Sequence, residues 1–586
     1  MQKFIREGLE FLYGKNTGSE TANRLEKLIT HWNFALMEIP KRKHKSPLTN
    51  KTVFLITYGD QIRDDINPPL HVLHNVARRY LTNLVNTMHI LPFYPYSSDD
   101  GFSVIDYYTV NPDLGSWHDI EAISQDFDLM FDGVFNHISA KSEWFRKFLD
   151  GDPCYRDFFI VPDKNMDLSR VVRPRVSPLL TPFLTKDGEK LVWTTFSADQ
   201  VDLNYKNPEV LLKIIDVLLF YVSKGASFIR LDAIAYLWKE SGTPCIHLPQ
   251  THTVVKIFRA ILEEIAPWVR IITETNVPHN ENISYFGNGF DEAHMVYNFT
   301  LPPLVLYSLL KGTSHKLNLW AKSLKIPKGD VSFLNYLASH DGIGVMPLYG
   351  ILDDAEITFL TNSVIQRKGF ISYKSNPDDS KAPYELNINY LDALSEPDCD
   401  SFDIAIKRFI LAHAIMLSFA GVPAIYFHSL FGSRGDLNGA LESGIPRRIN
   451  REKLKLDNLI SEIETTDSIR RRVFDALSGI LAGRIRLDIL NPENEQLVLD
   501  AGEDNFAFMR LSEEESLLCL FNISGKSNMA DIKLPDQFAT KVLTDVFTGK
   551  EFVVGTDSRL HAKLDPYNFY WMRNFLGLGT KHAIIH

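Results

Sequence analysis

The stretch FIRLDAIAY, Phe228 to Tyr236, begins as a short run of apolar and β-branched residues and then reaches an acid, Asp232. The same arrangement recurs in RIITET, Arg270 to Thr275, where Glu274 stands near the end of the run. Such runs alternate with longer helical patterns, which predicts parallel strands joined by helices. The predicted strands are Val53–Tyr58, Met88–Phe93, Leu129–Phe135, Phe228–Ala233, Arg270–Thr275, Met295–Phe299, Asn335–Ser339 and Pro423–His428. Eight is the number that a closed (β/α)8 barrel, or TIM barrel, requires.

One predicted helix has well-marked ends. Asn207 is a typical capping residue, Pro208 suits the first turn, Glu209 favours the positive end of the helix dipole, and Gly225 follows at the far end. Leucines, isoleucine and valine between these ends provide an apolar face, so we expect the helix to pack against the barrel.

Two insertions and a terminal domain are predicted around the barrel. The residues after the third strand contain the Pro-rich segment VVRPRVSPLLTPF, and those after the seventh contain the turn-rich SNPDDSKAP. After Asn491 short alternating strands predict a small β domain. We therefore divide the chain into 1–137 (N-terminal helical segment and first part of the barrel), 138–203 (inserted domain B), 204–349 (middle part), 350–401 (second insertion), 402–490 (last part) and 491–586 (C-terminal domain).

Composition narrows the class of protein. A formal net charge of −11 argues against a nucleic-acid partner, because such binding depends on clustered Lys and Arg. The four cysteines are far apart, which indicates neither a disulfide framework nor a zinc site. The apolar segment Ala412–Leu430 is interrupted by Gly421 and Pro423 and is interpreted as a buried helix followed by a strand. We expect a cytoplasmic enzyme with no membrane span.

Acids and histidines stand at the ends of most predicted strands, where the active site of such a barrel is assembled. They are Asp60, Asp132, His137, Asp232, Glu274, His340 and Asp341. Glycoside cleavage needs one carboxylate to attack the anomeric carbon and another to protonate the leaving oxygen. Arg230 lies on the same face of its strand as Asp232, so we expect it to keep that carboxylate ionised. Glu274 has no adjacent cation in sequence, which favours a raised pKa for a general acid.

Five blocks in this order resemble the conserved regions of the α-amylase superfamily. They are DGVFNH (Asp132–His137), QVDLNY (Gln200–Tyr205), FIRLDAIAY (Phe228–Tyr236), IITETN (Ile271–Asn276) and NYLASHDGIG (Asn335–Gly344). The resemblance implies that Asp232 is the nucleophile, Glu274 the acid/base and Asp341 the carboxylate that stabilises the transition state.

Finer motifs resemble the sucrose phosphorylase branch of that superfamily. They are ITYGDQ (Ile56–Gln61), LPFYPYSSDDGFSVIDY (Leu91–Tyr107), RPRVSPLLTPF (Arg173–Phe183), SHDGIGV (Ser339–Val345) and RRINR (Arg447–Arg451). The resemblance implies that Asp60 and Arg447 close the far end of a one-glucose pocket, and that Arg175 and Tyr384 bind phosphate. It further implies a substrate site of Tyr107, His137, Phe196, Gln200, Arg230, Tyr236, Asn276 and His340. At Tyr107 many relatives carry histidine.

The segments after Glu274 and Tyr236 are more similar to the glucosylglycerate phosphorylase subgroup. They read ETNVPHNENISYFGNGFDEAHMVYNFTLPPL (Glu274–Leu304) and LWKESGTPCIHLPQTH (Leu237–His252). The resemblance implies a hexosyltransferase that moves glucose between D-glycerate and inorganic phosphate, giving α-glucose 1-phosphate. Because glycerate carries a carboxylate, Arg434, His279 and Lys239 are candidate acceptor contacts.

Other readings stay open at this stage. Sucrose, sucrose 6′-phosphate or glucosylglycerol are alternative substrates, and a hydrolase or transglucosidase is an alternative reaction. A barrel that has lost catalysis is a third alternative. The presence of all three predicted catalytic acids argues against it. We expect no cofactor and no bound metal, although many amylases hold calcium near the position of Asn136. The chain is expected to act as a monomer or homodimer.

Overall fold

The computed structural model describes residues 3–37, 47–325, 327–376, 380–397 and 401–575. Its centre is a closed barrel in which neighbouring strands run parallel, in the order β1-β16-β12-β11-β10-β9-β4-β3. The strands are β1 Phe54–Thr57, β3 Thr87–Ile90, β4 Asp128–Gly133, β9 Ala226–Leu231, β10 Arg270–Thr273, β11 Met295–Tyr297, β12 Ser332–Asn335 and β16 Val422–Tyr426. The predicted TIM barrel is confirmed.

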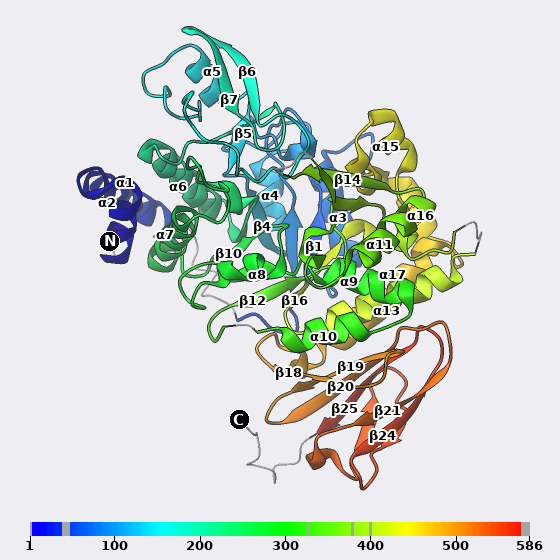
Figure 1. Ribbon diagram of the computed structural model, residues 1–586. Coiled ribbons are helices and arrows are strands. Elements are labelled where there is room, and N and C mark those ends of the chain that lie inside the picture. The colour runs from blue at the N-terminus through cyan, green and yellow to red at the C-terminus, as the bar shows by residue number, and fades with distance from the viewer. Residues whose placement is uncertain (1–2, 38–46, 326, 377–379, 398–400, 576–586) are drawn as a thin grey trace.

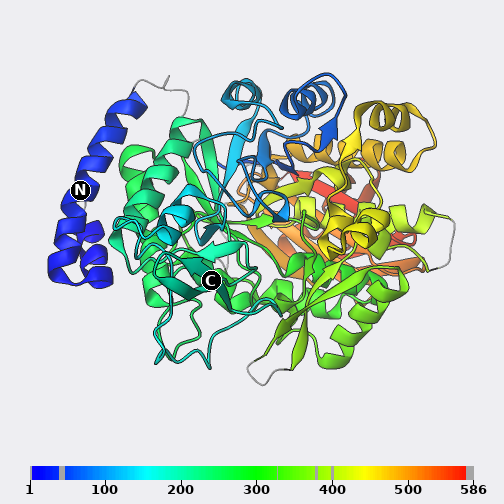
Figure 2. The ribbon, with the colours of Figure 1, turned by 90° about the horizontal axis from the view of Figure 1, so that it is seen from above.

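Helices cover the outside of this barrel (Figures 1 and 2). Among them are α3 Pro69–Tyr80, α4 Trp117–Ile123, α6 Pro208–Ser223, α7 Pro249–Ile265, α9 Leu301–Lys311, α10 His315–Ser323, α11 Asp354–Gln366, α13 Asp403–Ser418, α16 Leu456–Glu464 and α17 Ile469–Ile485. The strand interiors are fully buried, as in Ala226–Leu231 and Val422–Tyr426. Parallel strands covered on both faces require such continuous apolar runs.

Helix α6 has the predicted ends. The side chain of Asn207 accepts a hydrogen bond from the backbone N–H of Glu209, Pro208 opens the helix, and Gly225 follows it with a φ of 96°. The segment Ala412–Leu430 also divides as predicted, because α13 ends at Ser418 and β16 begins at Val422. None of the helices in the described ranges has both the length and the apolar character needed to cross a bilayer.

The prediction for the seventh strand, Asn335–Ser339, was wrong in its position. The strand is Ser332–Asn335, and its pairing with β16 ends at Asn335 opposite Pro423. The side chain of Asn335 donates a hydrogen bond to the carbonyl of Ala420 (3.0 Å), which closes the strand. The apolar run continues through Leu337 into the following loop, so alternation alone could not locate the end of the ladder.

The insertion after the third strand rises above the barrel (Figure 1). It contains β5 His137–Ser139, α5 Glu143–Leu149, the hairpin of β6 Leu180–Thr185 with β7 Gly188–Trp193, and β8 Gln200–Asp202. The insertion after the seventh strand forms a small antiparallel sheet of β13 Ile343–Gly344, β15 Lys381–Asn387 and β14 Phe370–Ser375, in the order β13-β15-β14. Both insertions lie at the end of the barrel where the strands terminate.

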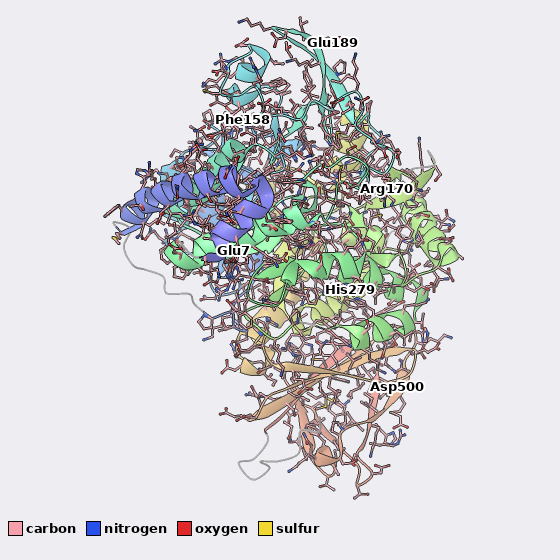
Figure 3. The ribbon with its side chains drawn as sticks, turned by 60° about the vertical axis from the view of Figure 1, so that its left-hand side comes forward. Glu7, Phe158, Arg170, Glu189, His279 and Asp500 are labelled. Carbon is pink, nitrogen blue, oxygen red and sulfur yellow. The ribbon has the colours of Figure 1, made fainter. Side chains whose placement is uncertain are left out.

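The C-terminal β domain lies at the opposite end of the molecule from the first insertion. Figure 3 shows Asp500 in this domain and Glu189 on the hairpin at opposite extremes. One sheet has the order β18-β19-β20-β25-β22-β23, with β18 Glu495–Leu499, β19 Asn505–Leu511, β20 Glu515–Asn522, β25 Phe569–Phe575, β22 Val542–Asp545 and β23 Glu551–Val553. The other pairs β21 Asn528–Lys533 with β24 Arg559–Leu564. At the N-terminal end of the chain, α1 Lys3–Tyr13 and α2 Lys15–Met37 pack outside α6 and α7 (Figure 2).

Candidate active site

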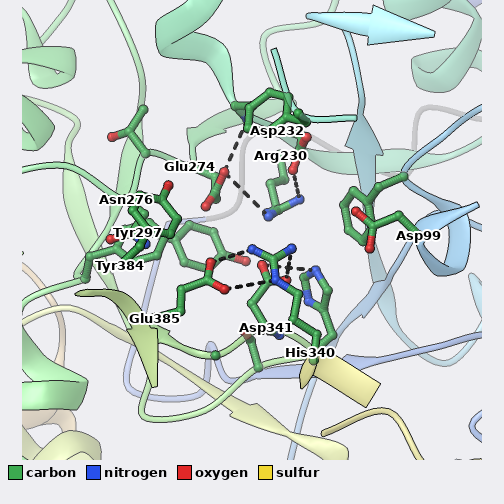
Figure 4. Close-up of a pocket in the computed structure, with 18 of the residues that line it drawn as sticks. Asp99, Arg230, Asp232, Glu274, Asn276, Tyr297, His340, Asp341, Tyr384 and Glu385 are labelled. Atoms are coloured by element: carbon green, nitrogen blue, oxygen red, sulfur yellow. Dashed lines mark hydrogen bonds and ion pairs between the residues drawn. The ribbon is translucent and has the colours of Figure 1, made fainter. Parts of the chain in front are cut away.

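A pocket opens where the barrel strands terminate, which is the end of such a barrel where active sites are assembled. Asp232 follows β9, Glu274 follows β10, and Asp341 comes from the loop after β12. All three line the pocket, and Figure 4 shows them around the guanidinium of Arg230. The sequence-predicted acids therefore converge on one cavity.

Arg230 links the carboxylates at the floor of the pocket. Its Nη1 lies 2.9 Å from Asp232 and also contacts Asp132, while its Nη2 lies 3.7 Å from Glu274. Glu274 additionally accepts a hydrogen bond from the backbone N–H of Ala233 (3.2 Å), whose φ of 49° is unusual for a residue with a side chain. This local conformation points the N–H that follows the predicted nucleophile at the predicted acid.

The expected separation of pKa values is not what the structure shows. Burial raises the pKa of Asp232 to about 7 and outweighs the opposing effect of Arg230. Burial, together with the charges of Asp232 and Asp341, also raises the pKa of Glu274 to about 7, again against Arg230. The pKa of Glu274 is thus raised as expected, although Arg230, which is not adjacent to it in the sequence, reaches it from the neighbouring strand. At neutral pH the pair holds about one proton, and the shorter contact of Arg230 with Asp232 favours the proton on Glu274.

Asp341 has a different environment. Its carboxylate contacts Arg447 (2.8 Å), Arg451 (3.2 Å) and His340 (3.4 Å). Burial acts to raise its pKa, but the charges of Arg447, Arg451 and Arg230 lower it well below the usual range. Asp341 is therefore ionised at physiological pH and is held by two arginines.

Aromatic and imidazole rings form a further part of the pocket wall. The ring of His340 stacks on Phe102 with centroids 4.7 Å apart, and burial lowers its pKa to about 3, so it is neutral. His137 shares a hydrogen bond with the carbonyl of Phe102 (2.9 Å) and lies 3.2 Å from the amide of Gln200. The rings of Phe196 and Tyr236 complete this wall and meet edge to face. Flat apolar rings interspersed with polar groups suit the binding of a sugar.

The residues expected to bind phosphate lie together. The guanidinium of Arg175 lies over the ring of Tyr384, 5.2 Å from its centroid, and 6.0 Å from that of Phe196. Both Arg175 and Tyr384 line the pocket, as does Asn276. Figure 4 shows Asn276, Tyr384 and Glu385 gathered on one side of the predicted catalytic acids and Asp99 on the other.

Two predicted substrate contacts lie elsewhere. Asp60 is ion-paired with Arg63 (2.5 Å) and Lys453 (2.7 Å) and does not line the pocket, whereas Arg447 does. Tyr107 is also outside the pocket lining, because its buried hydroxyl donates to the carbonyl of Val134 (2.8 Å). A position near the end of a strand is thus not enough to predict that a residue lines the pocket, because its side chain can point away from it.

Three charged residues at the site were not selected from the sequence. Asp99 and Glu385 line the pocket, and Arg451 pairs with Asp99 (2.9 Å), Asp100 (3.1 Å) and Asp341. Each lies inside or beside a quoted segment: Asp99 in SSDDGF, Glu385 directly after Tyr384, and Arg451 at the end of RRINR. The signal that could have found Asp99 is its charge beside the turn-forming Gly101 in a loop after β3. Asp99 and Asp100 both have positive φ values, 53° and 47°.

The acceptor candidates proposed from charge are engaged elsewhere. Arg434 pairs with Asp392, and the ring of His279 contacts Trp320 and Phe333 while its Nδ1 shares a hydrogen bond with Thr300. Lys239 is buried, with its ammonium 2.6 Å from Asp202 and 3.1 Å from the side-chain oxygen of Asn136. None of the three lines the pocket.

Glu263, His294 and Asp330 form a group of metal-ligand type within the described residues. It lies at the opposite ends of the strands from the pocket, since His294 and Asp330 precede β11 and β12. His294 Nδ1 accepts a hydrogen bond from the N–H of Ile271 (3.1 Å), and Arg259 pairs with Glu263 (2.8 Å). Arg259 also lies 3.9 Å from Asp330, so protein cations already neutralise both carboxylates and the group is a partly exposed ion-pair network.

Comparison with known proteins decides the family. Residues 78–342 match the α-amylase catalytic domain, and residues 496–571 match the C-terminal domain of maltogenic amylase. A glucosylglycerate phosphorylase from Spirochaeta thermophila is 52% identical over 525 residues, covering 89% of each chain. The glucosylglycerate phosphorylase of Escherichia coli is 43% identical, and the match covers 98% of this chain and 100% of the E. coli chain.

The chain belongs to the glucosylglycerate phosphorylase family. Glucosylglycerol and sucrose phosphorylases are more distant relatives. Among solved structures, the sucrose 6F-phosphate phosphorylase from Thermoanaerobacter thermosaccharolyticum has a TM-score of 0.72 at 23% identity and covers 87% of this chain and 99% of its own. This likeness shows that the chain shares the fold of that enzyme, and the resemblance to the α-amylase superfamily and its phosphorylase branch is confirmed.

Proposed function

We propose that this protein is a retaining phosphorylase that cleaves 2-O-α-D-glucosyl-D-glycerate with inorganic phosphate to give α-D-glucose 1-phosphate and D-glycerate. The observation that carries the proposal is the convergence of Asp232, Glu274 and Asp341 on one pocket that also contains Arg175 and Tyr384. The family relationship supports the substrate. The carboxylates provide the groups that cleave a glycosidic bond. The positive charge of Arg175 offsets their repulsion of the incoming phosphate anion.

The first step forms a covalent intermediate. Asp232 attacks the anomeric carbon while Glu274 gives its proton to the glycosidic oxygen, so the C–O bond breaks and glycerate departs with that proton. Asp341, which is held ionised by its arginines, stabilises the positive charge that develops on the sugar. The product is a β-glucosyl ester of Asp232.

The second step inverts the configuration of the anomeric carbon again. Once Asp232 is an ester, its negative charge is gone, and a cause of the raised pKa of Glu274 disappears with it. Glu274 then takes the proton from phosphate as a phosphate oxygen attacks the anomeric carbon and the ester bond breaks. The two inversions give net retention of the α configuration.

We further propose roles for the surrounding residues. Asp99 with Arg447 and Arg451 closes the glucose end, the role that the sequence assigned to Asp60 with Arg447, because Asp99 lines the pocket and contacts Arg451. His137, Phe196, Gln200, Tyr236 and His340 contact glucose, whereas Asn276, Arg175 and Tyr384 face the acceptor. A cytoplasmic location and a monomeric or homodimeric state remain our predictions, as does the absence of a cofactor.

A phosphorolysis assay tests the function. The purified protein is incubated with glucosylglycerate, sucrose, sucrose 6′-phosphate or glucosylglycerol, each with and without phosphate, and glucose 1-phosphate and free glucose are quantified. We expect phosphate-dependent glucose 1-phosphate from glucosylglycerate, with a kcat/KM at least roughly tenfold above that for the other substrates. Equal release of free glucose without phosphate would identify a hydrolase, and a preference for another donor would exclude the proposed substrate.

A further inference from the structure

The buried amide of Asn282 connects the segment after the proposed acid/base with the neighbouring barrel strand. Asn282 is the last residue of the short helix α8 His279–Asn282, and it is 1% exposed. Its side-chain oxygen accepts a hydrogen bond from the hydroxyl of Thr275 (2.7 Å), the residue directly after Glu274. Its side-chain NH2 group donates to the backbone carbonyl of Tyr297 (2.8 Å), the last residue of β11. One amide side chain therefore joins the loop after β10 to the end of β11.

This bridge lies where the ladder between the two strands stops. β10 and β11 pair up to Thr273, which lies opposite Val296, so Glu274 is beyond the last pair. On the other side, the backbone N–H of Glu274 donates to the carbonyl of Leu231 on β9 (3.2 Å). Asn282 thus provides on the β11 side the connection that a hydrogen bond between backbones provides on the β9 side.

The carboxylate of Glu274 itself is held by long contacts (Figure 4). It accepts a hydrogen bond of 3.2 Å from the N–H of Ala233 and lies 3.7 Å from Arg230. The same guanidinium lies over the ring of Tyr297, 5.7 Å from its centroid, and this ring lines the pocket with Glu274. The place of the carboxylate therefore depends on how the backbone around Glu274 is held relative to Tyr297.

We propose that Asn282 is a positioning residue for the reaction, which holds Glu274 within reach of the glycosidic oxygen by joining Thr275 to the end of β11. This inference rests on the proposed role of Glu274 as the acid. A general acid must lie within hydrogen-bond distance of the oxygen that it protonates, and a shift of about 1 Å can lower the rate by roughly 100-fold. Its loss of position affects only leaving groups that need a proton.

Two donors with different leaving groups test this role. Glycerate leaves as an alcohol and needs the proton of Glu274, whereas fluoride leaves α-glucosyl fluoride as a weakly basic anion and depends little on proton transfer. Initial rates give kcat/KM for each donor, which includes only the steps up to the glucosyl ester, so the later attack of phosphate does not enter the comparison. Because both values come from one enzyme preparation, any unfolded fraction cancels in their ratio.

Asn282→Ala removes both hydrogen bonds of the bridge. We expect the ratio of kcat/KM for glucosylglycerate to kcat/KM for the fluoride to fall by roughly 10- to 100-fold, because a displaced acid slows the first donor far more than the second. Glu274→Gln is the reference, since it removes the proton itself and should lower the ratio further. An unchanged ratio in Asn282→Ala, which equal losses for both donors would produce, would overturn the proposal.

The control is Asn522→Ala in the C-terminal domain. Asn522 of β20 is also buried, and its side-chain oxygen accepts a hydrogen bond from the hydroxyl of Ser524 (2.9 Å). Its NH2 group donates to the carbonyls of Lys526 (2.7 Å) and Asp565 (2.9 Å). We expect this variant to lose thermal stability and to keep the native donor ratio. A lowered ratio would mean that any loss of stability produces the effect, and the proposal would fail.

Variants of Thr275 identify the hydrogen bond that carries the effect. Thr275→Val removes the hydroxyl and should lower the donor ratio, while Thr275→Ser keeps the hydroxyl and should retain most of it. Adding Asn282→Ala to Thr275→Val should cause less than its effect in the native background, because both changes break the same bond. A native ratio in Thr275→Val, an equally low ratio in Thr275→Ser, or full additivity would each contradict the proposal.

Failure of the proposed function has a different signature. If the native protein releases fluoride but does not cleave glucosylglycerate, the proposed substrate is wrong. The comparison then uses the α-glucoside that the phosphorolysis assay selects, because any sugar or polyol leaving group needs the same proton. An unchanged ratio in Glu274→Gln would refute the proposed acid and this inference together.

Discussion

Asp232 and Glu274 are two buried acids on adjacent strands with one arginine between them. Burial raises the pKa of both, and the contact of Arg230 with Asp232 (2.9 Å) is shorter than its contact with Glu274 (3.7 Å). The difference in distance assigns the proton to Glu274 and the negative charge to Asp232. Covalent catalysis needs this distribution before the substrate enters.

The raised pKa of Glu274 also predicts a cost in stability. The unfolded chain ionises this carboxyl near its usual pKa of 4.5, while the folded protein holds the proton until about pH 7, so stability is lost as pH rises between these values. Glu274→Gln cannot ionise, and we expect it to raise the free energy of unfolding at pH 8 by roughly 1–3 kcal/mol. At pH 4.5 the gain should nearly vanish.

Urea unfolding at both pH values measures this effect. The exposed Glu189 on the β6–β7 hairpin provides the control, and Glu189→Gln should change stability little at either pH. A larger gain for Glu274→Gln at pH 4.5 than at pH 8 would show that its pKa is not raised in the folded protein.

A second residue-scale prediction concerns the nucleophile. Asp232→Asn retains the shape of the side chain but cannot form the glucosyl ester, so turnover of glucosylglycerate should fall by at least about 10⁴-fold. Glucose 1-phosphate release, measured alongside a circular dichroism spectrum to verify folding, checks this expectation. Retention of more than a few per cent of the activity would refute the assignment.

At the scale of elements, Lys239 ties together the segments that follow two barrel strands, β4 and β9. It follows β9 in the chain, its ammonium lies 2.6 Å from buried Asp202 of β8, and it donates to Asn136 in the loop after β4 and to the backbone carbonyl of Tyr236. The protein's own cation thus neutralises an aspartate that calcium could otherwise bind. This geometry supports our expectation of a metal-independent fold.

We expect Lys239→Met to destabilise the protein by about 3–5 kcal/mol, because it leaves the Asp202 charge buried without its cation. Lys206→Met, which removes an exposed partner of Glu240 (2.9 Å), is the control and should cost under about 1 kcal/mol. Thermal unfolding measures the stability of both variants. The same measurement on the native protein with and without a chelator tests whether its fold depends on a metal. A lower melting temperature of the native protein in chelator would contradict the metal-independent fold.

At the scale of the whole molecule, the buried Arg510 connects the barrel to the C-terminal β domain, and the buried Arg484 joins two segments of the barrel part near this contact. Arg510 of β19 donates to the carbonyl of Ser418 at the end of α13 (3.1 Å) and to those of Asn491 (2.7 Å) and Asn494 (3.0 Å). Arg484 of α17 donates to the carbonyls of Leu417 and Leu490. Burial lowers the pKa of Arg510 to about 10, so it stays charged at neutral pH.

Arg510→Met should therefore destabilise the molecule without altering catalysis. It leaves the buried carbonyl of Ser418 and the partly buried carbonyls of Asn491 and Asn494 without this donor, and we expect a loss of roughly 3 kcal/mol with kcat unchanged, because the arginine lies far from the pocket. Arg559→Met, at an exposed pair with Asp531 (2.8 Å), is the control. Differential scanning calorimetry and the phosphorolysis assay measure the two effects. A lower kcat at a temperature where the Arg510→Met variant is fully folded would show that the contact between the domains influences the active site.

The barrel and its catalytic acids could be predicted from the sequence because both depend on local pattern. Apolar runs alternating with helices specify parallel strands, and an acid just after a run, such as Asp232 or Glu274, must emerge at the common end of the barrel. The position of β12 was missed because apolar residues stand on both sides of Asn335, Phe333 and Leu334 before it and Tyr336 and Leu337 after it, and only pairing with β16 shows which of them belong to the strand.

By itself, the sequence determined the class of fold, the family and the three acids on the rim, since these follow from the order of residues along the chain. Tertiary structure alone decided that Asp99 enters the pocket while Asp60 pairs with Lys453, and that Glu385 bridges Arg175 and Arg447. The physical reason is that the direction of a loop side chain, and its pKa, depend on charges brought from distant segments by folding. Coulombic interaction and desolvation act through space. The pKa values of Asp232 and Glu274 therefore cannot be predicted from the residues that neighbour them in the sequence.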